Sequence, residues 1–272
     1  MEVDRSMKNR YLILGGAGAI GSELTKYFEN KNCIVDVIDI ALSEEQNLMN
    51  LQINELSEYE CIYFLAWDVG GSKYISDKKS QFSQYLANIN ISSNVFPQLH
   101  DSGTPFVFVS SQLAGFDQSA YSLTKILGEK LALEFPNSKA RVVRQWNVYG
   151  VHETHNQKSH VISDMINSAV AFGEIRLLTD GREKRQFVHI SDVCKAYDLV
   201  SHLSPDIYQV RSGHWIEIIE VAKILGEILN VPIKTGKLKG SSPEGVFSKD
   251  IPGWTPQVSL HEGLQDLAMK YT

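Results

Sequence analysis

The chain has 272 residues, of which 43% are hydrophobic and 21% are charged, and its formal net charge is −6. This composition is ordinary for a globular protein, and the length suits one large domain or a domain with an added lobe. The negative charge gives no support for a nucleic-acid or anionic-membrane partner, and no apolar run reaches the length of a membrane span. The cysteines Cys33, Cys61 and Cys194 lie far apart and without metal-ligand spacing, which favours a reducing compartment.

The first motif in the chain is rich in glycine. The apolar run Tyr11–Leu14 is typical of a buried parallel strand, and it is followed by Gly15, Gly18 and Gly21 and then by a helix-like segment, 22–30. A strand that turns through glycines into a helix directs backbone N–H groups and the positive end of the helix dipole at one place. That place suits a phosphate or pyrophosphate. Basic residues precede the run, but it is too short for a signal peptide, so we expect no targeting segment.

A second apolar run supports a dinucleotide as the ligand. Cys33–Asp39 reads as a strand that ends in an acidic residue, eighteen positions after Gly21. An acidic residue at this place accepts hydrogen bonds from the adenosine ribose and repels a 2′-phosphate, so Asp39 favours NAD over NADP. The alternative is that Asp39 simply ends a strand and begins a loop.

The following segments alternate between strands and helices. The polar segment 41–60 is expected to hold an irregular strand near Leu48–Ile53 and a turn of helix. Further strands are predicted at 61–66, 104–110 and 140–146, helices at 80–99 and 119–135, and a ligand-facing loop at 67–73. Strands that alternate with helices predict parallel βαβ units and a doubly wound α/β sheet.

The second half of the chain has shorter elements. Helices are predicted at 159–172, from Ser191 onward and at 215–229, with short strands at 175–178 and 187–190. Ser259 and Glu262 form a capping box that opens a last helix ending near Met269. Because no flexible linker separates the halves, we expect a smaller C-terminal lobe that interleaves with the first domain.

Three residues form a candidate catalytic set. Tyr121 and Lys125 lie four residues apart in the predicted helix 119–135 and so share one face. A nearby ammonium would lower the pKa of the tyrosine, which could then take a proton from a sugar or alcohol hydroxyl. Ser111, just after the preceding strand, would hydrogen-bond the reacting oxygen. A Tyr–Lys pair alone is weak evidence for a catalytic site. It becomes informative here because it follows a strand that ends in Ser110-Ser111 and lies downstream of the glycine motif.

The chain resembles the extended short-chain dehydrogenase/reductases, the NAD-dependent epimerase/dehydratase group acting mainly on nucleotide sugars. The matching segments, in the family's order, are the glycine loop, Leu65-Ala66, Val109-Ser-Ser111, the Tyr121/Lys125 pair, Arg144–Gly150, Arg185–Asp192, Gly253–Pro256 and Leu260–Leu264. The resemblance implies a Rossmann domain at 1–150 with a return segment at about 185–205, and a mainly substrate-binding lobe at 151–272. It also implies a cytoplasmic enzyme of polysaccharide biosynthesis, and a homodimer formed by the helices at 80–99 and 119–135.

The resemblance also implies roles for single residues. The expected cofactor-binding residues are Gly15, Gly18, Ala19, Ile20, Gly21, Asp39, Leu65, Ala66, Tyr121 and Lys125. The expected substrate-binding residues are Asp68, Gln112, Asn147 and Arg185, of which Asn147 and Arg185 fall where family members contact the diphosphate. His189 and Asp192 are expected to hold the local fold. His152, His155 and His160 crowd one loop but lack the partners that would complete a metal site.

Departures from the family pattern narrow the reaction. Gln112 and Leu113 follow Ser111, where the dehydratase branch places an Asp-Glu pair, so 4,6-dehydration is disfavoured. The loop at 67–71 resembles that of GDP-mannose 3,5-epimerases, but no cysteine lies near Ser111, so it hints only at a GDP-sugar. We therefore expect an NAD-dependent epimerase or dehydrogenase/reductase that acts on a nucleotide sugar, most readily at C4. The alternative is a non-catalytic NAD-binding regulatory protein of the same fold.

Overall fold

The computed structural model describes residues 8–71, 74–75, 77–116, 118–153, 159–242 and 248–271. In the first part of the chain the elements are β1 (Arg10–Leu14), α1 (Ala19–Glu29), β2 (Ile34–Ile38), the 3₁₀ turns η1 (Glu44–Gln46) and η2 (Leu56–Glu58), β3 (Cys61–Phe64), α3 (Lys78–Ser102), β4 (Phe106–Ser111), α4 (Ala120–Leu133) and β5 (Ala140–Gln145). In the second part they are β6 (Asn147–Tyr149), α5 (Val161–Phe172), β7 (Ile175–Arg176), β8 (Lys184–Arg185), β9 (Phe187–His189), α6 (Ile190–Ser201), β10 (Ile207–Val210), β11 (Ile216–Glu217), α7 (Ile218–Leu229), β12 (Ile233–Lys234), β13 (Lys249–Asp250) and α8 (Leu260–Met269).

A seven-stranded sheet forms the centre of the molecule. Its strand order is β13-β10-β5-β4-β3-β1-β2, and every pairing within it is parallel. The chain enters at β1, places β2 on one side and then continues with β3 on the other. The strand order therefore reverses between β1 and β3, and ligands bind beyond the carboxyl ends of the strands at such a reversal. This architecture confirms the predicted α/β fold class.

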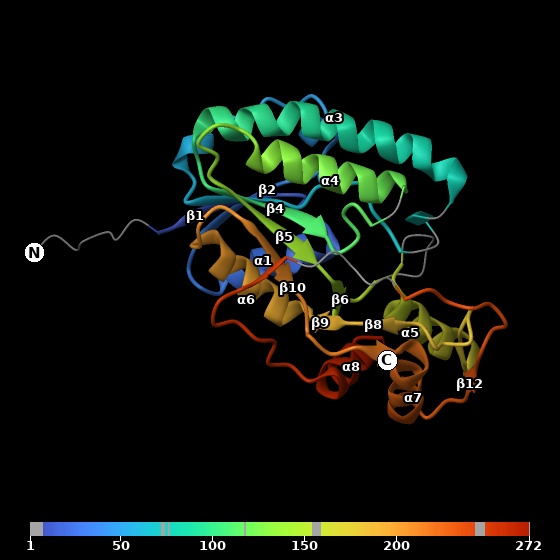
Figure 1. The fold of residues 1–272 in the computed structure, drawn as a ribbon. Coiled ribbons are helices and arrows are strands. Elements are labelled where there is room, and N and C mark those ends of the chain that lie inside the picture. Colours follow the sequence, from blue (N-terminus) through green and yellow to red (C-terminus); the bar gives the residue numbers. More distant parts are fainter. Residues whose placement is uncertain are drawn as a thin grey trace, which may run out of the picture.

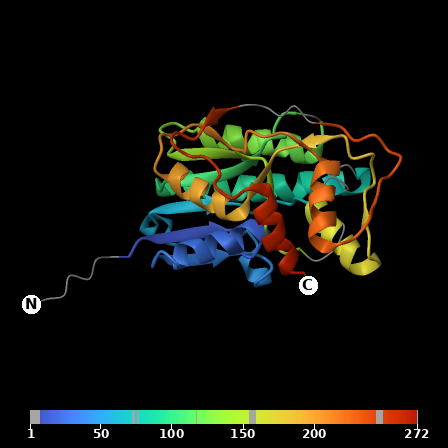
Figure 2. The ribbon, with the colours of Figure 1, turned by 90° about the horizontal axis from the view of Figure 1, so that it is seen from below.

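Helices cover both faces of this sheet. In Figure 1, α3 and α4 lie side by side over one face, and α1 and α6 cover the other. Figure 2 shows the second face from below, with α1, α6 and α8 toward the viewer. One buried apolar cluster lies between the sheet and each helix layer, which explains why β3 and β4 read as continuous apolar runs.

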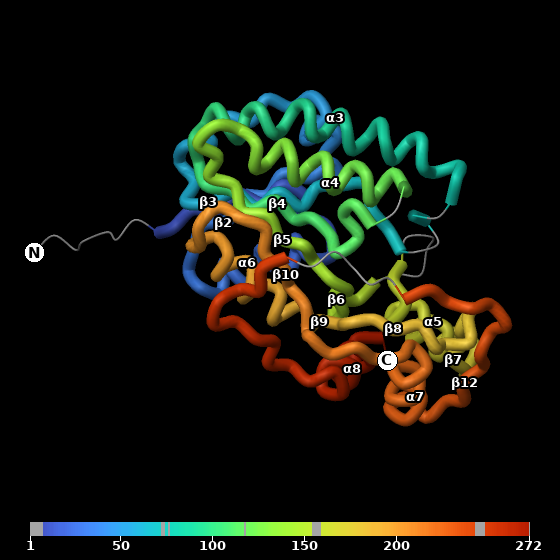
Figure 3. Tube along the Cα trace, in the orientation of Figure 1, coloured from blue at the N-terminus to red at the C-terminus, as the bar shows by residue number. Residues whose placement is uncertain are grey.

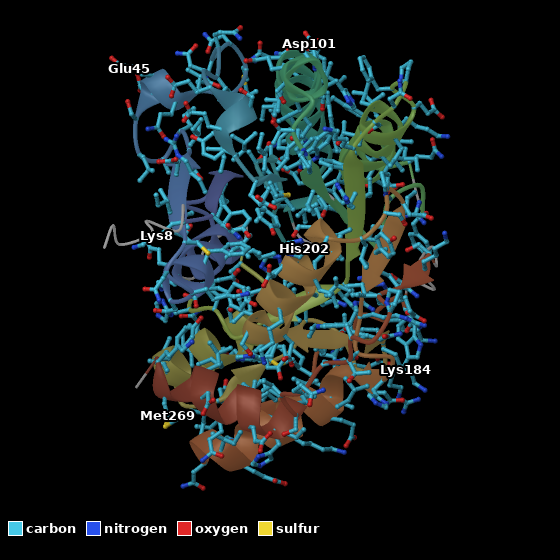
Figure 4. The ribbon with its side chains drawn as sticks, turned by 90° about the vertical axis from the view of Figure 1, so that its left-hand side faces the viewer. Lys8, Glu45, Asp101, Lys184, His202 and Met269 are labelled. Atoms are coloured by element: carbon cyan, nitrogen blue, oxygen red, sulfur yellow. The ribbon has the colours of Figure 1, made fainter. Side chains whose placement is uncertain are left out.

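The remaining short elements gather at one end of the molecule. Figure 3 shows β8, α5, α7 and α8 together there, around a third apolar cluster. In Figure 4, the labelled side chains of Glu45 and Asp101 lie at the opposite end of the molecule from Met269. The capping box at Ser259 and Glu262 is present at the start of α8, as predicted.

The predicted strand near Leu48–Ile53 is wrong, because this segment has no strand pairing. Side chains of α3 satisfy its backbone instead. Asn94 donates hydrogen bonds to the Leu48 and Leu51 carbonyls, and Gln98 accepts one from the Ile53 N–H. The turn of helix expected in the same region is found as η1 and η2.

Two further segments differ from the sequence reading. The amphipathic segment 215–229 begins as strand β11, which pairs with β8, and becomes helical only at Ile218. The strand β10 was not predicted, yet it joins the central sheet beside β5. The sheet is thus extended by two strands, β10 and β13, from the second half of the chain.

Candidate active site

A cavity of about 940 Å³ opens beyond the carboxyl ends of the central strands and extends into the second lobe. Every site residue predicted from the sequence lines it. These residues are Gly15, Gly18, Ala19, Ile20, Gly21, Asp39, Leu65, Ala66, Asp68, Ser111, Gln112, Tyr121, Lys125, Asn147 and Arg185. Segments far apart in the sequence therefore meet at one place.

The glycine loop at one end of the cavity has the shape of a phosphate cradle. Gly15 has a φ of +90°, and a Cβ there would lie 2.6 Å from the Ala66 nitrogen. A Cβ on Gly21 would lie 2.3 Å from the Gly15 carbonyl oxygen. Gly18 precedes the first turn of α1, is exposed and lines the cavity. Helix N–H groups at this end have no partners within the helix, and a pyrophosphate fits them.

Asp39 lies at the end of β2 beside this loop. Its carboxylate accepts hydrogen bonds from the backbone N–H groups of Ala17, at 3.0 Å, and Ala41, at 2.9 Å. Its own backbone N–H donates to the Gln46 side chain at 2.8 Å. The carboxylate is therefore fixed relative to the glycine loop, with lone pairs left for ribose hydroxyls. This donor and acceptor set fits an adenosine diphosphate.

The end of β3 lies next to the glycine loop. The backbone N–H groups of Leu65 and Ala66 both donate to the Leu14 carbonyl, at 2.9 and 2.8 Å. These bonds hold the strand end against β1 and leave both residues facing the cavity.

Ser111, Tyr121 and Lys125 come together where β4 ends and α4 begins. The Ser119 side chain caps α4 by accepting from the Ser122 N–H, which fixes the first turn that carries Tyr121. Tyr121 and Lys125 are 8% and 4% exposed. The Lys125 ammonium donates to the Val109 carbonyl at 2.6 Å.

Burial dominates the protonation of this set. It raises the pKa of Tyr121, and the hydrogen bond from the Ser111 side chain lowers it in part. Burial also lowers the pKa of Lys125 to about 7, although the attraction of Glu129 raises that pKa in part. The sequence predicted that Lys125 would lower the pKa of Tyr121, and the structure shows the opposite direction for Tyr121 because desolvation outweighs the hydrogen bond.

A buried ion pair supports this wall from behind. Glu129, on the same helix as Lys125, accepts hydrogen bonds from Arg144 on β5 and from the Ser110 hydroxyl on β4. The pair links α4 to the two strands beneath it. Sequence reasoning missed it, although Glu129 lies one helical turn from Lys125 on the same face.

Two of the predicted substrate-binding residues lie near the catalytic set. The Asp68 carboxylate accepts a hydrogen bond from the Tyr74 hydroxyl at 2.9 Å, and the Asp68 backbone is held by the buried Asn88 side chain. Gln112 is buried, and its backbone N–H donates to the Gln145 carbonyl. The predicted loop continues to Lys73, but residues 72 and 73 lie outside the described part of the chain.

The other two predicted substrate-binding residues, Asn147 and Arg185, lie toward the second lobe. Asn147 donates to the Gln186 carbonyl at 2.9 Å. Arg185 donates from one guanidinium nitrogen to the carbonyls of Lys184 and Ser241, and burial lowers its pKa. These contacts fix the guanidinium at the cavity wall. The sequence did not single out other lining residues of this lobe, such as Phe172, Thr179 and Glu183, because they occur in no recognisable motif.

The histidines after Gly150 make contacts of other kinds. His160 pairs with Glu153 at 2.8 Å, and His152 packs on the Tyr271 ring. His155 lies outside the described residues. Within the described ranges, no three His, Cys, Asp or Glu side chains are grouped as metal ligands. As expected, Asp192 is structural, since its carboxylate accepts from the Gln257 and Val258 N–H groups.

Comparison with known proteins gives consistent matches. Residues 11–210 match the NAD dependent epimerase/dehydratase family. A UDP-N-acetyl-alpha-D-glucosaminuronate decarboxylase of Bacillus cytotoxicus is 22% identical, covering 96% of this chain and 97% of its own. A putative UDP-glucose 4-epimerase of Methanocaldococcus jannaschii is 23% identical, covering 93% and 95%. The structure of an NAD-dependent NDP-hexosamine 5,6-dehydratase of tunicamycin biosynthesis superposes with a TM-score of 0.81, at 19% identity and 97% coverage of both chains.

Proposed function

Because the chain belongs to the NAD dependent epimerase/dehydratase family, we propose that it is a nucleotide-sugar epimerase or dehydrogenase/reductase acting at C4 of the sugar. Membership confirms the resemblance drawn from the motifs and, with it, NAD as the cofactor. The observation that best supports the reaction is the placement of Ser111, Tyr121 and Lys125 in one wall of the cavity that also contains the glycine loop.

In this proposal, Ser111, Tyr121 and Lys125 each have a distinct role. The glycine loop and Asp39 would hold NAD, which would supply the hydride-accepting and hydride-donating chemistry. Tyr121 takes the proton of the C4 hydroxyl and returns it. Ser111 hydrogen-bonds the same oxygen and stabilises the charge that develops there. Lys125 holds a ribose hydroxyl and, when charged, favours the tyrosinate.

The remainder of the cavity suits the nucleotide diphosphate. Arg185 offers a planar guanidinium to the phosphates, and Asn147 offers a side-chain amide from the neighbouring strand β6. We propose that Asp68 and Gln112 contact the sugar hydroxyls, since both line the same cavity as Ser111 and Tyr121.

The relatives carry out different reactions, so the choice among reactions depends on residues of this chain. A decarboxylase and a dehydratase are both among them. Elimination of water needs an acid and a base beside the reacting carbon. After Ser111 this chain has Gln112 and Leu113, neither of which is acidic. We therefore place hydride transfer at C4, without 4,6-elimination, as the overall chemistry.

The decisive experiment is a substrate panel. The purified protein is incubated with UDP-, GDP- and dTDP-sugars and NAD⁺, and the products are analysed by NMR. An inverted C4 centre without accumulation of reduced cofactor identifies an epimerase. A 4-keto product with stoichiometric reduced cofactor identifies a dehydrogenase. A product formed by loss of water or carbon dioxide from the substrate would contradict the proposal. Tight NAD binding without turnover of any sugar would favour the non-catalytic alternative.

We also propose how the chain is organised and where it acts. Residues 1–150 and about 185–205 form the cofactor domain, and the rest of 151–272 mainly binds substrate. The protein forms a cytoplasmic homodimer. The outer surface of α3 and α4 supports the dimer, because Phe82, Leu86, Ile89, Leu127 and Leu131 are exposed there. Among the described residues, no helix is both long and apolar enough to cross a membrane.

A further inference from the structure

The Lys125 ammonium is enclosed by aromatic rings. Its Nζ lies 4.4 Å from the centre of the Trp67 ring, 5.1 Å from that of Phe108 and 5.9 Å from that of Tyr121. The Val109 carbonyl accepts its hydrogen bond at 2.6 Å. Besides this hydrogen bond, the ring faces around Nζ attract its charge.

Local packing fixes the position of the Trp67 ring. The indole N–H donates to the Thr124 hydroxyl at 3.4 Å, one residue before Lys125 on α4. The ring packs edge-on against Phe64 and Phe108. Gly128 leaves the room for this arrangement, because a Cβ there would lie 2.5 Å from the Phe108 ring and 3.3 Å from the Trp67 ring. Trp67 therefore contacts strand β3 through Phe64, strand β4 through Phe108, and helix α4 through Thr124 and Lys125.

We propose that Trp67 is a positioning residue for Lys125: its ring face holds the ammonium against the Val109 carbonyl and excludes water from that side. An aromatic face attracts a cation, whereas an aliphatic side chain of similar size only removes water. Trp67 therefore acts on Lys125 in two opposed ways, by desolvating it and by stabilising its charge. The relevance to catalysis rests on the proposed function, but the contact itself does not.

The charged and titratable groups around Lys125 come from several elements. On α4 they are Tyr121 and Glu129, of which Glu129 attracts the ammonium. Arg144 on β5 is already paired with Glu129. After β3, the Asp68 carboxylate accepts from Tyr74. Burial lowers the pKa of Lys125 to about 7, and the attraction of Glu129 raises it in part.

The test follows Lys125 directly, without any substrate. Lysine labelled with ¹³C at Cε is titrated by NMR, and the Lys125 signal is assigned by its loss in Lys125→Met. Trp67→Leu keeps the site dry but removes the ring face, so the midpoint should fall by about one pH unit. Trp67→Ala admits water, so the midpoint should rise by about one unit or more. Trp67→Phe should restore the midpoint to within about half a unit.

Phe64→Leu is the matched control. It removes a ring of the same cluster that packs on Phe96, Phe108 and Trp67, whereas Nζ lies over the rings of Trp67, Phe108 and Tyr121. Its midpoint should match that of the unchanged protein. Equal midpoints in the Leu, Ala and unchanged proteins would overturn the proposal.

A second measurement applies if a Trp67 variant fails to fold. The indole ¹⁵N–¹H signal of Trp67 should move with pH at the Lys125 midpoint in the unchanged protein and stay constant in Lys125→Met. A signal that does not titrate would also overturn the proposal. If these titrations succeed while the sugar panel gives no product, the proposed function fails and the Trp67 contact stands.

Discussion

Arg144 and Glu129 form a buried two-pronged ion pair behind the cavity wall that contains Tyr121 and Lys125. The Arg144 Nε and Nη2 atoms lie 2.9 and 2.7 Å from the two Glu129 carboxylate oxygens, and both side chains are almost fully buried. The Ser110 hydroxyl donates to the same carboxylate at 2.6 Å. Removing one partner leaves the other charge unpaired in the interior, which is costlier than removing both.

Replacing one member of this pair should destabilise the protein strongly. Glu129→Leu or Arg144→Met is expected to lower the free energy of unfolding by about 3–5 kcal/mol. The double variant should be clearly more stable than the sum of the two losses predicts. Urea unfolding measures all three. Glu134→Ala, which breaks the exposed Lys130–Glu134 pair on the same helix, should change stability little. Additive single losses would contradict a coupled pair.

Tyr121→Phe should abolish most of the activity without unfolding the protein. Loss of a positioned acid/base lowers kcat by about 10² to 10⁴-fold. NAD binding, measured by calorimetry, should remain. The control is Tyr208→Phe, a buried tyrosine on β10 whose hydroxyl donates to the Ser204 carbonyl away from the cavity. A Tyr121→Phe variant with full activity would remove Tyr121 from the mechanism.

Asp39→Ala should weaken NAD binding. The carboxylate accepts hydrogen bonds from the Ala17 and Ala41 N–H groups, and we propose that it also binds the ribose. Charged hydrogen bonds of this kind correspond to about a 10- to 100-fold change in Kd. Binding of NADP should weaken less, because the repulsion of a 2′-phosphate is relieved. Asp36→Ala is the control, since Asp36 lies on the same strand but pairs with Arg10. Unchanged NAD affinity would argue against the assigned ribose site.

The lowered pKa of Lys125 predicts how stability depends on pH. Below pH 7 the lysine is protonated in both states, but above its folded pKa of about 7 only the unfolded chain keeps the proton. The free energy of unfolding should therefore rise with pH from this group, by at most about 1.4 kcal/mol per pH unit. The pKa values of Cys61 and Cys194, raised to about 12, have the opposite effect: above pH 9 they make the free energy of unfolding fall with pH.

The comparison with Lys125→Met isolates this effect, because both proteins keep all other titrating groups. Urea unfolding between pH 6.5 and 8.5 should show the unchanged protein gaining stability relative to the variant. A constant difference across this range would mean that the lysine keeps an ordinary pKa in the folded protein.

Charges placed on the outer face of α3 and α4 should dissociate the proposed dimer. Leu86→Glu with Leu131→Glu introduces like charges on an apolar surface that two copies would share. Sedimentation should then change from a dimer to a monomer with the fold intact. Val170→Glu, at an exposed position on α5, is the control and should leave the mass unchanged. A monomeric unchanged protein would refute the dimer.

The sequence by itself determined the fold class and the family, because these depend on local patterns. The apolar runs of β1, β3 and β4 are long enough to identify buried parallel strands. The glycines at 15, 18 and 21 meet steric requirements that neighbouring residues impose. Weakly patterned segments were misread or missed. Leu48–Ile53, predicted as a strand, is held by side chains of α3, and β10, which was not predicted, depends on pairing with β5, a distant strand.

Only the tertiary structure decided the electrostatics of the site. The spacing of Tyr121 and Lys125 predicted that they share a helix face, which follows from local geometry. Their protonation depends on burial and on Ser111 and Glu129, which come from two different elements. Desolvation is a property of everything packed around a group, so no local pattern in the sequence contains it. For that reason the motifs identified which residues meet in the site, whereas the packing around them determined their pKa values.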